Sequence, residues 1–211
     1  GRFPEPKSIL EFTLSYIKED QILKNQFKNI SILITAGPTI EEIDPIRFVS
    51  NKSSGKQGFE IASELTRRGA QVTLISGPVN IPFPNCKNII QVKTAKEMLD
   101  NVTQHLPTDI LICSAAVADW RLIPKTSSNN KIDTNNKIKK TNKKLFFETE
   151  KNPDILESIS KSNVRPKIVI GFSAETTNIN QNAHSKLMSK NIDLIIANDV
   201  SDNKVFGERS C

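Results

Sequence analysis

The stretch "NISILITAGPTIEEIDPIRFVSNKSSGKQGFEIASELTRRGAQVTLISGP", residues 29–78, decides the fold. It opens with a β-rich run, 29–37, that predicts a buried strand ending at Gly37. A long loop follows, and from Gly55 the apolar residues recur at helical spacing. A second β-rich run, 71–78, then predicts another strand. A strand, a helix and a second strand in this order are typical of a parallel sheet.

The remainder of the chain alternates helical and extended patterns in the same way. The first further helix has Thr94 as N-cap with Glu97 three residues later, the pattern of a capping box, and the second has Pro153 in its first turn. We therefore predict one α/β domain with a doubly wound, mostly parallel, Rossmann-like sheet and helices on both faces. The expected helices span 94–106, 152–160 and 178–191, and the expected strands span 109–117, 144–150, 167–175 and 193–200.

Four of the predicted strands end in loops of glycine or other small residues. Such residues let backbone N–H groups approach a ligand closely, and in open parallel sheets ligands bind beyond the carboxyl ends of the strands. Tight turn geometry alone is an equally good explanation for any one of these loops. The loops are 37–39, 77–78, 114–116 and 171–173.

Composition and charge exclude several classes of protein. No apolar run approaches the ~20 residues needed to cross a bilayer, and the first ten residues lack the apolar region of a signal peptide, so we expect a cytoplasmic protein without membrane contact. The net charge is +6, but the lysine excess lies in 129–144 and aromatic residues make up only 6% of the chain. We expect no nucleic-acid partner, since a base-stacking surface would need aromatic residues among the lysines.

Three cysteines are too few and too irregularly spaced for a disulfide framework or a zinc site, so Cys86, Cys113 and Cys211 are expected to be reduced. Cys113 follows an apolar run, where a cysteine is usually a small core residue and not a nucleophile. His105 and His184 have no acidic or thiol neighbour at metal-ligand spacing and are assigned no role.

The segment 50–58, "SNKSSGKQG", is similar to a phosphate-binding loop but fails the rules for the common ones. A Walker A loop needs a glycine where Ser50 stands and a serine or threonine where Gln57 stands, and no GxGxxG pattern follows the first strand. What remains is a loop of hydroxyl and amide side chains at a helix N-terminus, where N–H donors favour an anion. An elaborate N-cap explains the same residues equally well.

Two groups of lysines and one aspartate are further candidates for ligand contact. Lys137 and its neighbours 139 and 140 lie in a polar loop that is either a solvated surface or a mobile clamp on a triphosphate. Lys186 and Lys190 lie four residues apart, so both could reach one ligand, or they could form a basic surface stripe. Asp119 follows a predicted strand end, where its carboxylate suits a ligand or a metal ion as well as a turn cap.

Several motifs together resemble the phosphopantothenate–cysteine ligase family in order and spacing. They are "ITAGPTIEEIDPIRFVSNKSSGKQGFEIA" (34–62), "SAAVADWR" (114–121), "KIKK" (137–140), "KNPDIL" (151–156), "GFSAET" (171–176), the lysine pair 186 and 190, and "NIDLIIANDV" (191–200). The resemblance covers residues 30 to about 200. It implies that 1–29 are a linker or the tail of an upstream flavin-dependent decarboxylase, whose FMN would bind outside this chain, and that 30–211 are the ligase domain.

The resemblance implies a two-step reaction in coenzyme A biosynthesis. The carboxylate of 4′-phosphopantothenate attacks the α-phosphate of CTP with Mg²⁺ present, and pyrophosphate leaves. The amine of cysteine then displaces CMP from the acyl-cytidylate to form the amide. Such chemistry needs a cradle for the triphosphate and a cationic clamp, and no dedicated nucleophile. The resemblance also implies a homodimer with the phosphopantothenate site near the subunit boundary, and it does not identify the metal ligands.

Site residues carried over from the family fall into two sets that share some members. Lys137 is expected to support formation of the acyl-cytidylate, and Asn51 to face phosphopantothenate and support conversion of the intermediate. The expected phosphopantothenate pocket contains Arg47, Asn51, Ala115 and Ala116. The expected nucleotide site contains Gly37, Ser53, Gly55, Gly58, Ser114, Ala115, Asp119, Lys137, Pro153, Asp154, Ile155, Leu156, Phe172, Lys186 and Lys190.

The chain also departs from the family pattern. Trp120 stands where tyrosine is frequent, Ser173 where alanine is frequent, and the insertion between Arg121 and Lys137 is long and rich in asparagine. Family members continue past the last predicted strand, so we expect the C-terminal part of the domain to be missing. A nucleotide-binding module without turnover and an NAD(P)- or flavin-dependent oxidoreductase are the competing interpretations, the second resting on fold analogy alone.

Overall fold

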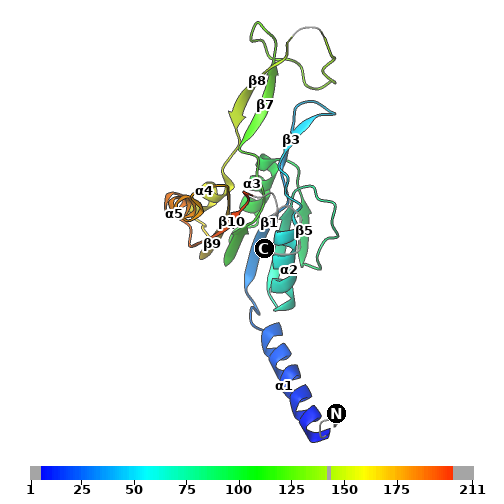
Figure 1. Cartoon of the computed structure of the whole chain (residues 1–211), viewed down its shortest axis with the longest axis vertical. Helices are drawn as coiled ribbons and strands as arrows, with labels where there is room; N and C mark the ends of the chain where they lie inside the picture. The colour runs from blue at the N-terminus through cyan, green and yellow to red at the C-terminus, as the bar shows by residue number, and fades with distance from the viewer. Residues whose placement is uncertain (1–5, 142–143, 202–211) are drawn as a thin grey trace.

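The centre of the molecule is a six-stranded sheet in which every neighbouring pair of strands is parallel. In the computed structural model, which describes residues 6–141 and 144–201, the chain fills one half of the sheet and then the other (Figure 1). The predicted doubly wound sheet is confirmed. The strand order is β10 (Leu194–Asp199), β9 (Ile168–Glu175), β6 (Ile110–Cys113), β1 (Ser31–Ala36), β4 (Gln71–Ser76) and β5 (Asn88–Gln91).

The strand order reverses between β1 and β6. From β1 the chain moves outward through β4 to β5, and it then returns to the other side of β1 to build β6, β9 and β10. Loops that leave β1 and β6 therefore turn toward opposite faces of the sheet and open a crevice at its carboxyl edge. This crevice is where an open α/β sheet binds its ligand, and the predicted small-residue loops 37–39 and 114–116 lie there.

Helices cover both faces of the sheet, as the sequence predicts. On one face α2 (Lys56–Arg67) buries Phe59 and Ala62 against Ile34 and Leu74 of the strands. On the other face lie α3 (Ala95–Gln104), α4 (Ile155–Ser160) and α5 (Ile179–Lys190), whose apolar side chains form a second cluster with alternate residues of the same strands. Because successive side chains of a strand point to opposite faces, each central strand contributes to both clusters.

Two antiparallel pairs extend beyond the carboxyl edge of the sheet (Figure 1). The longer pair is β7 (Trp120–Lys125) and β8 (Phe146–Lys151). Together with the loop residues 126–141 and 144–145 it forms what we call the arm. The shorter pair, β2 (Ile40–Glu42) and β3 (Phe48–Ser50), lies beside it. The expected long loop after β1 is thus wrong in part, since the turn that begins at Asp44 folds it into a hairpin. Asp44 Oδ1 accepts hydrogen bonds from the Ile46 and Arg47 N–H groups.

The first helix, α1 (Pro6–Lys24), projects from the opposite end of the sheet (Figure 1). The sequence gives no reason to expect a helix in this expected linker, and its apolar residues Ile9, Leu10 and Leu14 are exposed. The chain joins the core only after α1, where Phe27 packs against the cluster under α2 and its N–H group donates to the Arg68 carbonyl at 3.0 Å. No helix among residues 6–141 and 144–201 is long and apolar enough to cross a membrane.

Most other predicted elements are confirmed with shifted ends. The capping box of α3 is present, with Thr94 Oγ1 accepting from the Glu97 N–H group and the Glu97 carboxylate accepting from the Thr94 N–H group. The helix predicted over 152–160 begins later, at Ile155, because the Asp154 side chain is its N-cap and accepts from Glu157 N–H at 2.9 Å. Pro153 therefore precedes the helix instead of lying in its first turn.

Candidate functional site

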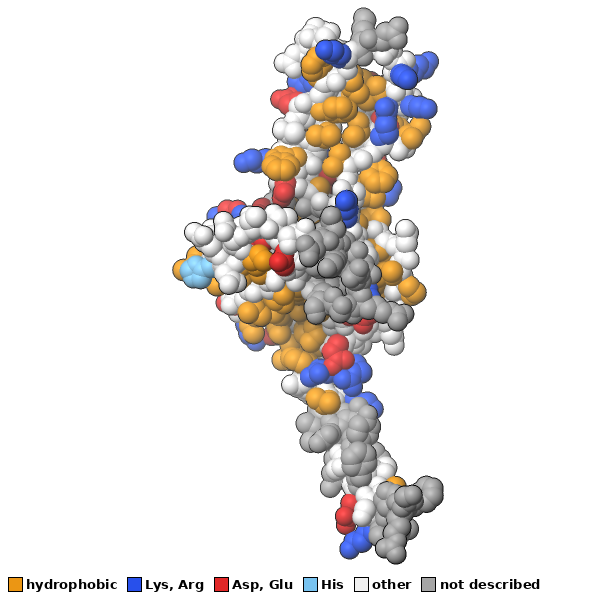
Figure 2. All heavy atoms as spheres, in the orientation of Figure 1, with side chains coloured by type: hydrophobic (Ala, Val, Ile, Leu, Met, Phe, Trp, Pro, Cys, Tyr) orange, Lys and Arg blue, Asp and Glu red, His pale blue; other side chains and the backbone are white. Residues whose placement is uncertain are grey.

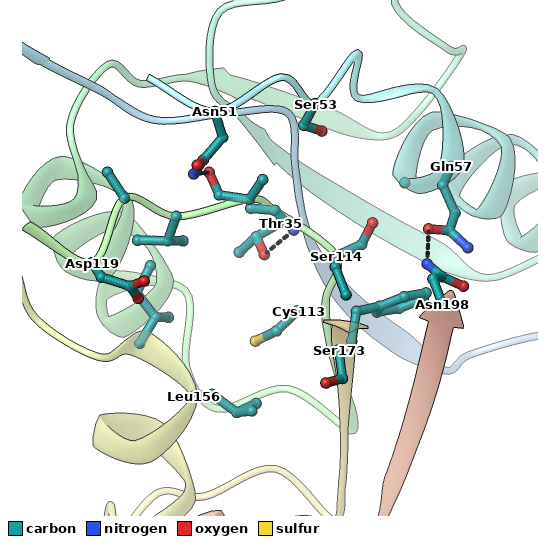
Figure 3. A pocket seen from close by; sticks show the side chains of 18 of the residues that line it. Thr35, Asn51, Ser53, Gln57, Cys113, Ser114, Asp119, Leu156, Ser173 and Asn198 are labelled. Carbon is teal, nitrogen blue, oxygen red and sulfur yellow. Dashed lines mark hydrogen bonds between the residues drawn. The ribbon is translucent and has the colours of Figure 1, made fainter. Parts of the chain in front are cut away.

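A cavity of about 1150 Å³ opens at the carboxyl edge of the sheet, at the point where the strand order reverses (Figure 3). It is enclosed by the segment 51–58 on one side, by 113–120 and 151–157 on the other, and by the ends of β9 and β10. The cavity brings together most of the site residues that are expected from the sequence. These are Asn51, Ser53, Gly55, Gly58, Ser114, Ala115, Ala116, Asp119, Pro153, Asp154, Ile155, Leu156, Phe172, Lys186 and Lys190.

The segment 51–58 lines the cavity where helix α2 begins. The N-cap of α2 is Gly55, with a φ of 77°, and it offers no side-chain oxygen to the first turn. Ser53 Oγ accepts from the Gly55 N–H group at 3.3 Å, and Ser54 Oγ accepts from the Lys56 N–H group at 3.4 Å. These bonds turn the backbone directly before the helix. Both readings of this segment thus have support, because it shapes the helix start and also presents hydroxyl groups and N–H donors to the cavity.

Close packing of glycines holds this segment against the sheet. A Cβ atom on Gly58 would lie 2.6 Å from Ala36 Cβ and 3.0 Å from Ser114 Oγ, so any side chain there would collide with β1 and fill the cavity floor. Gly37, with a φ of 74°, lies behind Gly55 at the end of β1. It is not among the described residues that line the cavity. Its expected place near the nucleotide stays a prediction, and in the structure Gly37 lets the two loops approach closely.

Asn51 follows the hairpin and contacts the loop after β6. Its Nδ2 atom donates to the Ala116 carbonyl at 2.8 Å, and the side chain is otherwise exposed (Figure 3). The loop after β6 is fixed by further bonds, since the Ala116 N–H group donates to the Gly37 carbonyl at 2.9 Å and the Thr39 N–H group donates to the Ala116 carbonyl at 3.1 Å. Asn51 and Ala116, expected in one pocket, are therefore in direct contact.

The lysine pair on α5 lines the cavity, but the two ammonium groups have different partners. Lys186 Nζ donates to the Phe172 carbonyl at 2.9 Å, which leaves its charge uncompensated by an acid in that contact. Lys190 Nζ lies 2.8 Å from Asp154 Oδ2 and 2.6 Å from Glu157 Oε2. Hydrogen bonds to Asp154 and Glu157 raise the pKa of Lys190, so it stays charged. Lys186 is thus better placed than Lys190 to meet an anionic ligand.

The acidic and thiol groups of the cavity include no activated cysteine nucleophile and, within the described residues, no metal-ion cluster. Burial raises the pKa of the Cys113 thiol to about 12, so it is protonated at neutral pH and is not a nucleophile. Cys86 and Cys113 are both free, as expected, and Cys211 lies outside the described residues. The Asp119 carboxylate is exposed at the cavity edge. Within the described residues no three His, Cys, Asp or Glu side chains gather at a metal-ion site.

Mg²⁺ usually binds through one or two carboxylates plus substrate phosphates, so the donor set of this cavity fits a nucleotide-bound Mg²⁺ and does not form a metal cage of its own. Asp119 and Glu60 are the lining carboxylates that can share such an ion, because Asp154 and Glu157 already pair with Lys190. The described part of the chain thus supplies a partial coordination sphere.

Two residues assigned to the site lie away from the cavity. Arg47 belongs to the turn between β2 and β3, and Lys137 belongs to the loop of the arm, and the described lining residues include neither. Their expected roles stay predictions, and within one chain both residues lie outside this cavity. The physical reason is that both elements extend outward from the carboxyl edge of the sheet (Figure 1).

Sequence reasoning missed several polar residues of the cavity. Asn152 Nδ2 donates to the Ala118 carbonyl at 2.8 Å and its N–H group donates to the Asp119 carbonyl at 2.9 Å, which ties the start of α4 to the loop that carries Asp119. Asn198 of β10 contacts Gln57 of α2 at 3.3 Å (Figure 3). Asn152 and Asn198 both lie inside motifs that carry the family resemblance, "KNPDIL" and "NIDLIIANDV". Their place in these motifs could have indicated that they belong to the site.

Comparison with known proteins identifies the family of the chain. Residues 27–210 match the family described as the DNA/pantothenate metabolism flavoprotein C-terminal domain. The chain belongs to this family. The match begins at residue 27 and so includes the whole six-stranded sheet.

Relatives within the family are proteins named coenzyme A biosynthesis bifunctional protein CoaBC. The one from Haemophilus influenzae is 40% identical over 207 residues, which are 98% of this chain and 49% of that protein. The one from Borreliella burgdorferi is 43% identical over 211 residues, 99% of this chain and 50% of that protein. The chain therefore spans about half the length of the curated relatives it matches.

A solved structure shares both sequence and fold with the chain. It is the crystal structure of the C-terminal domain of a coenzyme A biosynthesis bifunctional protein CoaBC, with 39% sequence identity and a TM-score of 0.69. The similarity covers 83% of this chain and 80% of that chain. The predicted resemblance and the predicted fold class are thus confirmed together.

Proposed function

We propose that the chain ligates 4′-phosphopantothenate and L-cysteine to 4′-phosphopantothenoylcysteine, with CTP as the activating nucleotide, as a step of coenzyme A biosynthesis. The observation that carries this proposal is the cavity at the strand-order reversal, where the segment 51–58 faces the "KNPDIL" segment and the lysines of α5. Its residues are those of the ligase motifs, and the curated relatives that span this chain are bifunctional coenzyme A biosynthesis proteins. We propose a decarboxylase domain as the fused partner.

The cavity suits an activation step that depends on positioning and charge. In the first step the carboxylate of phosphopantothenate attacks the α-phosphorus of CTP, and the bond to pyrophosphate breaks. The N–H and hydroxyl groups of 53–55 and the Lys186 ammonium can hold phosphate oxygens where negative charge develops. Mg²⁺ bound to the triphosphate would neutralise charge on its oxygens, and Asp119 and Glu60 are the lining carboxylates that could share it.

The second step needs an acyl group held beside an incoming amine. The amine of cysteine attacks the acyl carbon of the acyl-cytidylate, CMP leaves with the bonding electron pair, and the amine loses a proton. Asn51 contacts the Ala116 carbonyl from the hairpin side, at the end of the cavity that faces Asp119 (Figure 3). An amide side chain fixed there can orient the acyl group without taking part as acid or base.

Lys137 needs a route to the reacting phosphate, because it lies on the arm and not among the described lining residues. We propose a homodimer, in which a second copy packs against the arm and hairpin. Exposed apolar side chains on these elements support this proposal (Figure 2), since contiguous exposed apolar surface marks interaction sites. They are Ile46, Phe48, Trp120, Leu145, Phe146 and Phe147.

Incubation of the protein with CTP, Mg²⁺, phosphopantothenate and cysteine, with pyrophosphate and the amide product measured separately, tests the proposal. Pyrophosphate release that requires phosphopantothenate but not cysteine is the expected result, because activation precedes amide formation. Replacement of CTP by ATP in a parallel reaction measures the nucleotide preference. Release of no pyrophosphate with either nucleotide, together with measurable nucleotide binding, would instead identify a binding module without turnover.

A further inference from the structure

One buried carboxylate joins the hairpin to the lysine-bearing loop of the arm. Asp44 is only 3% exposed although it lies in a turn between two short strands. Its Oδ1 atom accepts from the Ile46 N–H group at 3.0 Å and from the Arg47 N–H group at 2.9 Å, and these two bonds shape the turn. This half of the carboxylate does what an aspartate before a Pro-containing turn commonly does.

The other carboxylate oxygen has a different set of partners. Asp44 Oδ2 accepts from the Ile138 N–H group at 3.1 Å and from Arg47 Nε at 3.0 Å, and it also pairs with Arg47 Nη2. Arg47 Nη2 in turn donates to the Ile138 carbonyl at 2.8 Å. Both polar backbone groups of Ile138 are therefore held by one ion pair, whose members lie 94 and 91 residues earlier in the chain. We call this arrangement the Asp44–Arg47 clasp.

The clasp holds Ile138, the second residue of the "KIKK" segment. Ile138 is flanked by Lys137 and Lys139, whose side chains are exposed, within a long polar loop that links the two strands of the arm. A loop of this kind has many conformations of similar energy unless particular contacts select one. Two hydrogen bonds to one residue, each with a charged partner, are the stronger kind and fix the backbone at that residue. The directions in which the neighbouring lysines leave the backbone are fixed with it.

We propose that Asp44 is a positioning residue for Lys137, and that it acts through the clasp on Ile138. The inference rests on the proposed function, in which Lys137 supports the first step. Arg47 is the second member of the clasp, and its side chain is still 46% exposed. Asp44 does not touch the reactants; it restricts where the lysine can be when they are bound.

The substitution Asp44→Asn should remove the bonds of the clasp and keep those of the turn. The Oδ1 atom of asparagine can still accept from Ile46 and Arg47 N–H, whereas an NH₂ group in place of Oδ2 cannot accept from Ile138 N–H or attract the guanidinium. Loss of hydrogen bonds to a charged group should raise the exchange rate of the Ile138 amide hydrogen about tenfold or more. The turnover number for pyrophosphate release should fall about tenfold with KM values within about twofold, as expected for a group that matters in the transition state.

Asp133→Asn is the matched control. Asp133 is an exposed carboxylate of the same loop whose Oδ1 accepts from Asn135 N–H at 3.0 Å, a bond that asparagine keeps. This variant should show wild-type exchange at Ile138 and wild-type pyrophosphate release. A second variant, Ile138→Pro, removes the N–H donor from the loop side without changing the hairpin, and should reduce pyrophosphate release as Asp44→Asn does.

The measurements test the clasp and the positioning role of Asp44 separately. Wild-type exchange at Ile138 in Asp44→Asn would show that the clasp does not hold the loop. Faster exchange with wild-type pyrophosphate release in Asp44→Asn would overturn the positioning role of Asp44, and so would wild-type pyrophosphate release in Ile138→Pro, which has no amide hydrogen at this position. Absence of pyrophosphate release from the wild-type protein would refute the proposed function, and the exchange rates would then still decide whether the clasp exists in solution.

Discussion

Asn51 and Lys137, proposed to act in successive steps, have different surroundings in the structure. Asn51 lines the cavity and donates to the Ala116 carbonyl at 2.8 Å. Lys137 lies on the arm next to Ile138, which the Asp44–Arg47 clasp holds. A residue already fixed in the cavity suits the orientation of an acyl group, whereas a charge carried on a projecting loop suits a step that begins once the substrates are in place.

The first prediction concerns this division of roles. Lys137→Gln removes a positive charge and should lower the rate of pyrophosphate release by about 10²-fold or more, as loss of one electrostatic stabiliser commonly does. Asn51→Asp adds a negative charge at the acyl group and should leave pyrophosphate release measurable while the acyl-cytidylate accumulates. Rapid-quench assays with radiolabelled CTP follow both species. Arrest of the two variants at the same step would contradict the assignment.

The second prediction concerns Gly58. An alanine there would place its Cβ atom 2.6 Å from Ala36 Cβ, on a buried strand that cannot move away. Overpacking of this kind costs about 1–3 kcal/mol, and the same methyl group would crowd Ser114 at the cavity. Gly58→Ala should therefore lower both the melting temperature and the affinity for CTP, measured by thermal melts and calorimetry. Ser63→Ala, on the exposed side of the same helix, is the control and should change neither. Unchanged melting of Gly58→Ala would contradict the packing argument.

At the scale of elements, the sequence predicts best what has a strong period. The strands β1 and β4 and the helices α2 and α3 appear within a few residues of their expected positions, because their apolar residues recur at strand or helix spacing. The pairs β2–β3 and β7–β8 and the edge strand β5 were missed in whole or in part. β5 has four residues and no fully buried side chain, so it carries no such period.

In the candidate site, too, some positions could be predicted from the sequence and others could not. Residues at the ends of the sheet strands meet in the cavity as predicted, because parallel strands bring their carboxyl ends to one edge. The positions of Arg47 and Lys137 were not predictable, since they depend on antiparallel pairs that project from that edge. Asp44 was overlooked for another reason. Its aspartate–proline sequence indicates a turn, and the second set of bonds joins residues that are 94 positions apart.

The third prediction concerns the N-terminus of α3. Thr94 accepts from the Glu97 N–H group at 3.1 Å, and replacement of such a cap by alanine costs about 1 kcal/mol. Thr94→Ala should lower the free energy of unfolding by about that amount, as urea titration would show. Thr103→Ala in the same helix, where the hydroxyl only donates to the Leu99 carbonyl, is the control and should have a smaller effect. Equal effects of the two changes would show that the capping box contributes nothing particular.

At the scale of the whole molecule, the exposed apolar side chains of the arm and of the hairpin β2–β3 predict self-association. Phe48 of β3 and Trp120 of β7 are 55% and 52% exposed, and exposed large aromatic side chains of this kind are enriched at interfaces. In the fourth prediction, light scattering during gel filtration gives a mass of twice the 23.5 kDa of one chain. Phe48→Glu should shift the mass toward that of the monomer, whereas Val164→Glu, an equally exposed apolar position away from the arm, should not. A monomer at all concentrations would contradict the proposed homodimer.

The fifth prediction concerns the response of the whole fold to acid. Hydrogen bonds from Lys161 and Lys190 lower the pKa of Glu157 from 4.5 to about 2, and bonds from Arg67 and Arg68 do the same for Glu64. A depressed pKa means that the unfolded chain takes up protons first as the pH falls. The stabilising contribution is therefore complete above pH 4.5 and is lost as the pH falls toward 2.

Thermal melts between pH 6 and pH 2 measure this effect, and the melting temperature should fall most steeply below about pH 4.5. Glu157→Gln should make the fall shallower, because glutamine cannot be protonated in this range and so removes one linked group. A repeat at about 1 M salt, where the Debye length is about 3 Å, should also flatten the curve, since these ion pairs lie at the surface. If neither the substitution nor the salt changes how steeply the melting temperature falls with pH, acid destabilises the fold through other carboxylates, and these ion pairs do not contribute to its stability against acid.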